Sequence, residues 1–151
     1  MFQKDADDFD RVVILRRQRN EAEDAAAKRR LREAALRALE RATELVLDIG
    51  DLCLELVDHA LIVFDTGAKK VRGDSGAAIS SAIAGATTTI FVANLNLRSF
   101  QGGQWSVTIQ DRVNRMQEML LDKQAAALNR ASALQPPLGD EGQGFLFNEL
   151  K

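Results

Sequence analysis

Apolar residues recur three or four positions apart along most of the chain, the spacing that places side chains on one face of an α-helix. The four stripes are Phe2, Ala6, Phe9 and Val13; Leu31, Ala35, Leu39, Ala42 and Val46; Leu52, Leu56, Ala60 and Phe64; and Trp105, Ile109, Val113, Met116 and Leu120. They predict helices over about 2–19, 21–47 and 105–133, with a break or a bend at Gly50, after which the third stripe is another helix or the same helix continued. We expect that third helical segment to end near Gly67, because glycine is a common C-cap.

The stretch Ser75–Leu97 contains no charged residue. Its length would suffice to span a bilayer, but its serines, threonines and asparagines argue against a helix facing lipid. Its small residues allow close packing, so we expect this helix at the centre of a soluble bundle. Residue propensities alone would make Thr87–Leu95 a strand, because threonine, isoleucine, phenylalanine and valine follow one another there.

The composition also favours helices. Aromatic residues make up 5% of the 151 residues, tyrosine is absent and only 2 residues are proline, which is poor material for a β-sandwich or barrel. We therefore predict an all-α fold, an up-and-down helical bundle with the uncharged helix at its centre. The bundle should occupy residues 1–134, followed by a tail over 135–151 whose Phe145-Leu146-Phe147 triplet is expected to dock on a partner.

Charge and residue counts exclude several classes of function. With 20 basic and 22 acidic residues and a pI near 5.5, a nucleic-acid partner is not expected. The basic residues of 28–32 are interleaved with glutamates and read as a solvated helix face. One cysteine and one histidine leave no internal disulfide and no metal site of the Cys or His type. No signal peptide follows Met1, which predicts a cytoplasmic protein that does not insert into a membrane.

A basic segment interrupted by glycines, Ala68–Gly76, separates the third stripe from the uncharged helix. Loops of this kind carry function more often than helix faces do. Asp74 or Ser75 would also serve as the N-cap of the helix that follows.

Five short motifs keep one order and register along the chain: Asp5-Ala6-Asp7-Asp8-Phe9, Ala42-Thr43-Glu44, Gly67, Gly73-Asp74-Ser75-Gly76 and Asn96-Leu97. Over about 5–98 the sequence therefore resembles the formiminotetrahydrofolate cyclodeaminase and methenyltetrahydrofolate cyclohydrolase family. Ala68 and Lys70 stand where that family has two loop asparagines. Its members also carry two further helices before the region that matches Asp5, so the resemblance implies a partner chain that supplies them or a copy that has lost its site.

The resemblance implies chemistry on the methenyl bridge of tetrahydrofolate, which closes with release of ammonia or opens with addition of water. Such reactions need a group that moves protons and donors that hold the pterin, and no metal or further cofactor. A tetrahydrofolate derivative would be the substrate or ligand. The residues implied are Asp74 and Asp5 for proton transfer, Lys69 and Lys70 for the glutamate tail, and Gly73, Ser75 and Asn96 as further substrate contacts. Asp74 is equally suited to a simple capping role.

Three functions remain open at this point. The first is an enzyme of the cyclodeaminase or cyclohydrolase type, the second is a non-catalytic accessory subunit of a larger enzyme, and the third is a helical adaptor without any folate ligand. In each case we expect a homo-oligomer, most simply a two-fold dimer, or a complex with a larger subunit. The reason is that a helix without a charged face must be enclosed on all sides.

Overall fold

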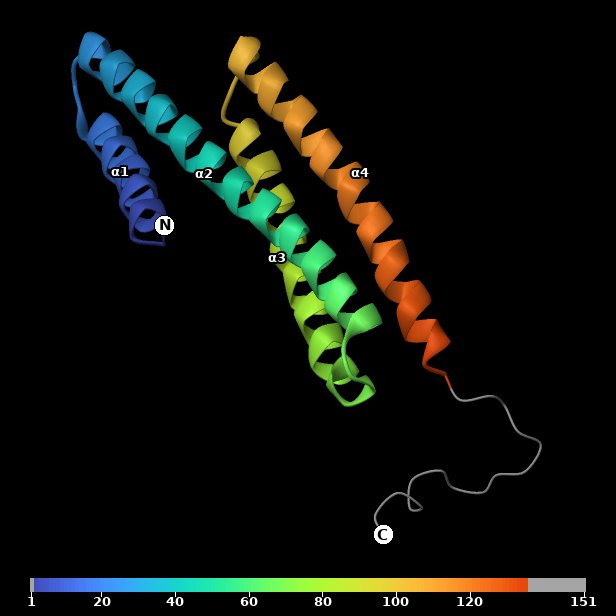
Figure 1. Cartoon of the computed structure of the whole chain (residues 1–151). Coiled ribbons are helices and arrows are strands. Elements are labelled where there is room, and N and C mark those ends of the chain that lie inside the picture. Colours follow the sequence, from blue (N-terminus) through green and yellow to red (C-terminus); the bar gives the residue numbers. More distant parts are fainter. Residues whose placement is uncertain (1, 136–151) are drawn as a thin grey trace.

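The computed structural model describes residues 2–135, with side chains from Phe9 onward. Its elements are α1 (Phe2–Glu21), α2 (Ala25–Thr66), the short 3-10 helix η1 (Lys69–Val71), α3 (Arg72–Leu97) and α4 (Gln104–Ala133). Successive helices alternate in direction, and α1 and α4 lie on opposite sides of the α2–α3 pair (Figure 1). No strand occurs in the part of the chain that the structure describes. The predicted all-α bundle is therefore confirmed.

Helix α2 is continuous over 42 residues, so the chain does not break at Gly50 and the third stripe is the same helix continued. The Asp24 carboxylate caps its N-terminus by accepting a hydrogen bond from the Ala27 N–H at 2.9 Å. At the other end the Gly67 N–H donates to the Val63 carbonyl at 2.8 Å. The end near Gly67 is thus as predicted.

Gly50 lies in α2 where α3 and α4 both approach it. A Cβ at this position would overlap Thr89 Oγ1 and would lie 2.9 Å from Met116 Sδ. The Thr89 hydroxyl donates to the Ala86 carbonyl at 2.8 Å and lies 3.8 Å from the same sulfur atom. Gly50 therefore serves close packing of three helices, and the helix continues through it.

Helix α3 includes the segment that residue propensity assigned to a strand. The hydroxyls of Thr87, Thr88 and Thr89 each donate to a carbonyl three or four residues earlier, so their polar atoms are satisfied within the helix. α3 also begins earlier than predicted, at Arg72, with Val71 rather than Asp74 or Ser75 at the N-cap. Both residues lie inside the first turns, and the expected loop is correspondingly shorter.

The main core lies between α2, α3 and α4 and is formed by Leu47, Leu54, Ala86, Ile90, Ala93, Ile109, Val113, Met116 and Leu120. α1 is attached through Val12, which packs on Ala38 and Leu39 of α2. Two of the predicted stripes are partly wrong: Phe9 and Val13, like Leu52 and Leu56, are at least half exposed. The stripe of α4 is correct, with its four residues from Ile109 to Leu120 buried.

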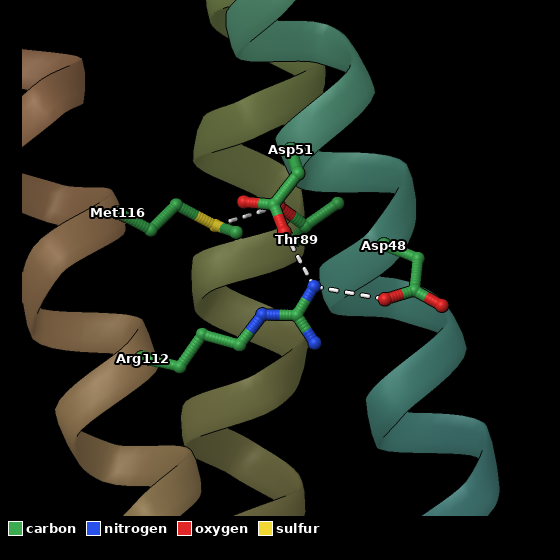
Figure 2. A network of polar contacts seen from close by, with 5 residues as sticks. All are labelled: Asp48, Asp51, Thr89, Arg112 and Met116. Carbon is green, nitrogen blue, oxygen red and sulfur yellow. Dashed lines mark hydrogen bonds and ion pairs between the residues drawn. The ribbon is translucent and has the colours of Figure 1, made fainter.

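A row of ion pairs, preceded by one hydrogen bond from a neutral indole, fixes α4 alongside α2. Glu44, Asp51, Asp58 and Asp65 recur every seven residues on α2, and their partners on α4 are, in order, Trp105, Arg112, Lys123 and Arg130. Arg112 also bonds Asp48 at 2.8 Å (Figure 2). Because both series ascend together, α2 and α4 run parallel, as an up-and-down bundle requires.

Three members of this row, Arg112, Asp65 and Arg130, have displaced pKa values, and the pKa of Arg130 is raised by its hydrogen bonds to Asp65. Burial lowers the pKa of the Arg112 guanidinium, but its hydrogen bonds to Asp51 and Asp48 outweigh burial and raise the pKa overall. Hydrogen bonds from Arg130 hold the pKa of the Asp65 carboxyl below its ordinary value. Each shift favours the charged, paired state of the folded protein.

One face of α3 is left uncovered by the residues that the structure describes. It consists of residues spaced alternately four and three apart, which we call the outer face of α3: Ala77, Ser81, Ala84, Thr88, Phe91 and Leu95. Phe91 is 66% exposed and Leu95 is 58% exposed. By length and composition α3 could cross a membrane, yet 33% of its most apolar stretch is buried against the other helices. α3 is therefore partly a core helix with one open apolar side.

Gly50→Ala should destabilise the protein by about 1–3 kcal/mol, because the added methyl group must displace Thr89 or Met116. Gly76→Ala is the matched control on α3, where a Cβ would meet no atom within 4 Å. It should raise stability by about 0.5–1 kcal/mol through helix propensity. Urea unfolding followed by circular dichroism measures both. Equal effects of the two substitutions would contradict the three-helix contact.

Asp65→Asn should lower the urea midpoint at pH 7 and have no effect in acid. Because the folded-state pKa of Asp65 is lowered, its contribution is complete above the pKa of the unfolded chain and disappears as the pH falls through the folded value. The difference between the two proteins should therefore close below about pH 4. Asp111→Asn on the exposed side of α4 is the control and should leave the midpoint unchanged at either pH.

Candidate functional site

A small apolar hollow of about 250 Å³ lies where α1, α2 and α3 meet. Its walls are mostly aliphatic or aromatic, and its polar groups are two threonine hydroxyls and one amide. The lining residues are Phe9, Ala42, Val46, Ile49, Thr88, Thr89, Val92 and Asn96. A cavity of this make-up suits a flat ring with a few polar edges.

Asn96 is the most versatile polar group of this hollow. Its Nδ2 donates to the Oγ1 of buried Thr43 at 3.1 Å, and Thr43 in turn donates to the Leu39 carbonyl at 2.7 Å. This chain of bonds fixes the orientation of the amide. The Oδ1 atom of Asn96 has no hydrogen-bond partner among the described residues and can accept one from a ligand.

Three of the sequence motifs converge on this hollow. Phe9 closes the first motif on α1, Ala42 and Thr43 belong to the second on α2, and Asn96 belongs to the last on α3. Residues far apart in the sequence thus become neighbours. Asp5 stands one helical turn before Phe9 on α1, and its side chain lies outside the described residues.

The basic loop and the start of α3 form a second region. Lys69 and Lys70 lie in η1 and are exposed, as are Gly73 and Asp74 in the first turn of α3. Ser75 is buried, and its hydroxyl donates to the Val71 carbonyl at 3.1 Å. Its proton is therefore already engaged within the helix, while Asp74 and the two lysines are open to solvent.

These two regions lie at opposite ends of α3. Asp74 and Asn96 are 22 residues apart on one continuous helix, which corresponds to roughly 33 Å at 1.5 Å per residue. A single chain therefore does not bring the predicted proton-transfer residue Asp74 and the predicted amide contact Asn96 to one ligand.

No residue that lines the hollow is ionisable among those that the structure describes. Across residues 9–135 there is also no group of three or more His, Cys, Asp or Glu side chains able to hold a metal ion. Cys53 packs against the main core, and His59 is exposed. The hollow can bind and orient a ligand, and a proton donor or acceptor must come from elsewhere.

Thr88 and Val92 were not predicted as site residues. Both stand on α3 one or two turns before Asn96 and face the same hollow. Within the helix predicted over Ser75–Leu97, the positions four and eight residues before Asn96 would have found them.

The comparison with known families is consistent with this arrangement. The family model described as formiminotransferase-cyclodeaminase matches residues 1–115, which covers α1, α2, α3 and the first part of α4. No curated protein sequence matches the chain.

Proposed function

The chain belongs to the formiminotransferase-cyclodeaminase family, and from this premise we propose that it binds a one-carbon derivative of tetrahydrofolate in sites shared between the two copies of a dimer. Membership relates the chain to folate-dependent cyclodeaminase. The observation that carries the proposal is the convergence of three family-like motifs on one ring-sized hollow. This family of cytosolic enzymes also supports the cytoplasmic location expected from the sequence.

The hollow supports a pterin ring as its occupant. Its aliphatic walls can stack on the ring, and the free Oδ1 of Asn96 can accept a hydrogen bond from a ring N–H. An amide held by Thr43 loses little freedom on binding, which favours affinity.

The outer face of α3 supports a second copy of this chain as the partner. The face bears no charge, so a charged partner surface would gain nothing there. The side chains in its N-terminal half are small, and those in its C-terminal half are larger. An antiparallel pair of α3 helices would place Phe91 opposite Ser81 and Leu95 opposite Ala77, large residues against small ones in both directions. A two-fold axis near Ala86 produces this matching, and a two-fold contact is the commonest symmetry of homo-oligomers.

The same two-fold arrangement would bring the separated site residues together. Asp74 and Val92 are 18 residues apart, five full helical turns, and so lie on the same side of α3. Val92 lines the hollow. With the axis near Ala86, Asp74 of one copy comes to the level of residue 98 of the other, about 3 Å along the helix from Asn96. Asp74 would then approach the hollow of the second copy.

In this dimer each residue type has a defined role. Asn96 and Thr88 hold the pterin, Asp74 of the second copy moves the proton as the methenyl bridge closes or opens, and Lys69 and Lys70 beside it attract the carboxylates of the glutamate tail. Asp5, one turn from Phe9 on α1, is the alternative proton-transfer group. Gly73 leaves space next to Asp74, because a Cβ there would meet no atom within 4 Å.

The second candidate is a non-catalytic accessory subunit. The absence of ionisable residues from the described lining of the hollow favours it. Such a subunit would bind the folate derivative, or only its partner enzyme, without converting the ligand.

The wild-type chain should be a dimer of twice 16.6 kDa at low micromolar concentration in light scattering coupled to size exclusion. Phe91→Glu should give monomers with unchanged helix content, because two buried carboxylates per contact are expensive and Phe91 is 66% exposed in the single chain. Ile62→Glu, which alters a residue of α2 that is 58% exposed, is the matched control and should remain dimeric. A wild-type monomer, or a dimeric Phe91→Glu variant, would contradict the α3 contact.

Complementation between variants tests the shared site. Asp74→Asn and Asn96→Ala homodimers should each fail to turn over methenyl- or formimino-tetrahydrofolate. Co-refolded mixtures should recover about a quarter of wild-type activity, because half of the dimers are mixed and each has one intact site. Asn94→Ala, which lies on α3 outside the hollow, is the control and should be active.

Calorimetry on the same proteins separates the two candidates. Binding of 5-formyl-tetrahydrofolate by the wild-type dimer without any turnover would favour the accessory subunit. No binding at high micromolar ligand would overturn the folate proposal itself. If the Asp74→Asn and Asn96→Ala variants are both inactive and their mixture recovers no activity, the site is not shared between the two copies.

A further inference from the structure

A second hollow, unlike the first in chemistry, lies at the α1–α2 end of the bundle. It has a volume of about 430 Å³ and is lined by side chains from both helices and from the turn after α3. The lining residues are Arg16, Arg19, Arg32, Ala35, Leu36 and Ser99. An adjoining hollow shares Arg19 and Arg32 and adds Asn20, Lys28 and Arg29.

The arginines of this hollow lack carboxylate partners within residues 9–135. Arg16 donates to Ser99 Oγ at 3.3 Å, and Arg19 donates to Asn20 Oδ1 at 2.9 Å, both neutral acceptors. Arg32 has no hydrogen bond or ion pair to any described residue. By contrast, two neighbouring arginines are paired with glutamates on the next turn of their helices. Arg17 follows Arg16 on α1, and Arg29 lines the adjoining hollow.

The surrounding segment is strongly positive in a chain whose overall charge is −2. Residues 11–32 contain eight basic and three acidic residues, an excess of five positive charges. Like charges brought together by the packing of α1 on α2 repel one another, which costs stability unless an anion lies between them. The sequence alone hid this feature, because the arginines of α1 and α2 meet only across the helical hairpin.

The number and geometry of the three guanidinium groups determine which class of anion fits the hollow. A guanidinium binds two oxygen atoms of one oxyanion in a planar fork. A carboxylate carries a single charge and satisfies one such fork, whereas a phosphate or diphosphate group offers at least three oxygen atoms and two or more charges. Three arginines around one hollow therefore match a phosphate group better than a carboxylate.

We infer that the hollow formed by Arg16, Arg19 and Arg32 is a binding site for a phosphate or diphosphate group of a small molecule, separate from the apolar hollow at Asn96. The Ser99 hydroxyl supplies a further hydrogen bond, and Leu36 and Ala35 form an apolar floor. The site is independent of the folate proposal, since it shares no residue with the other hollow.

Titration of the full chain with inorganic pyrophosphate tests this inference, using calorimetry at low ionic strength where screening is weak. One saturable site per chain is expected. Arg32→Gln and Arg19→Gln should each weaken binding at least about tenfold, because each removes a charge-assisted hydrogen bond. Arg30→Gln is the matched control: it removes the same charge from the same helix but does not line the hollow, and it should weaken binding less than about twofold.

Three outcomes would overturn the site. The first is no saturable binding up to millimolar pyrophosphate. The second is an equal effect of Arg30→Gln and Arg32→Gln, which would indicate only the general charge of the segment. The third is tri-glutamate binding as tightly as pyrophosphate, which would overturn the choice of phosphate over carboxylate.

Discussion

Gly50 allows three helices to meet at one level of the bundle. Thr89 of α3 and Met116 of α4 occupy the space in which any residue type other than glycine at position 50 would place its side chain. Core residues continue from this point toward both ends, with Leu47 on one side and Leu54 on the other. Since the hollow at Asn96 is bounded by the same stretch of α2 and α3, its shape depends on this close approach.

The ion pairs between α2 and α4 fix how far one helix is shifted along the other. Apolar packing alone tolerates sliding of one helix along another, whereas charged partners at fixed levels do not. Arg112 joins Asp48 and Asp51 next to the Gly50 level, and Arg130 joins Asp65 a full two heptads further on (Figure 2 shows the first of these). The carboxylates of these pairs are about half exposed to solvent, so the pairs set alignment more than they add stability.

The helices themselves were predictable because apolar spacing and low aromatic content pointed the same way. What the sequence could not show was tertiary in origin. Gly50 suggested a break, and only the neighbouring Thr89 and Met116 explain why it is a packing position instead. The threonines near Ile90 favoured a strand by propensity, but their hydroxyls bond back along the helix.

The candidate site was predictable in part for the same reason. The motifs that meet at the hollow were identified, while the distance between Asp74 and Asn96 along α3 became apparent only once the helix was known to be continuous. The basic residues of 28–32 were interpreted as a solvated helix face, because their convergence with the arginines of α1 depends on the hairpin between the two helices.

The uncharged stretch of α3 also has a consequence during synthesis. When Leu97 has been added, α2 is available to cover one side of α3, but the residues of α4 that complete the core, from Ile109 to Leu120, do not yet exist. At 5–20 residues per second, the ribosome needs about 1–5 s to supply them. During this interval α2 is the helix on which this segment, long and apolar enough to span a membrane, can pack.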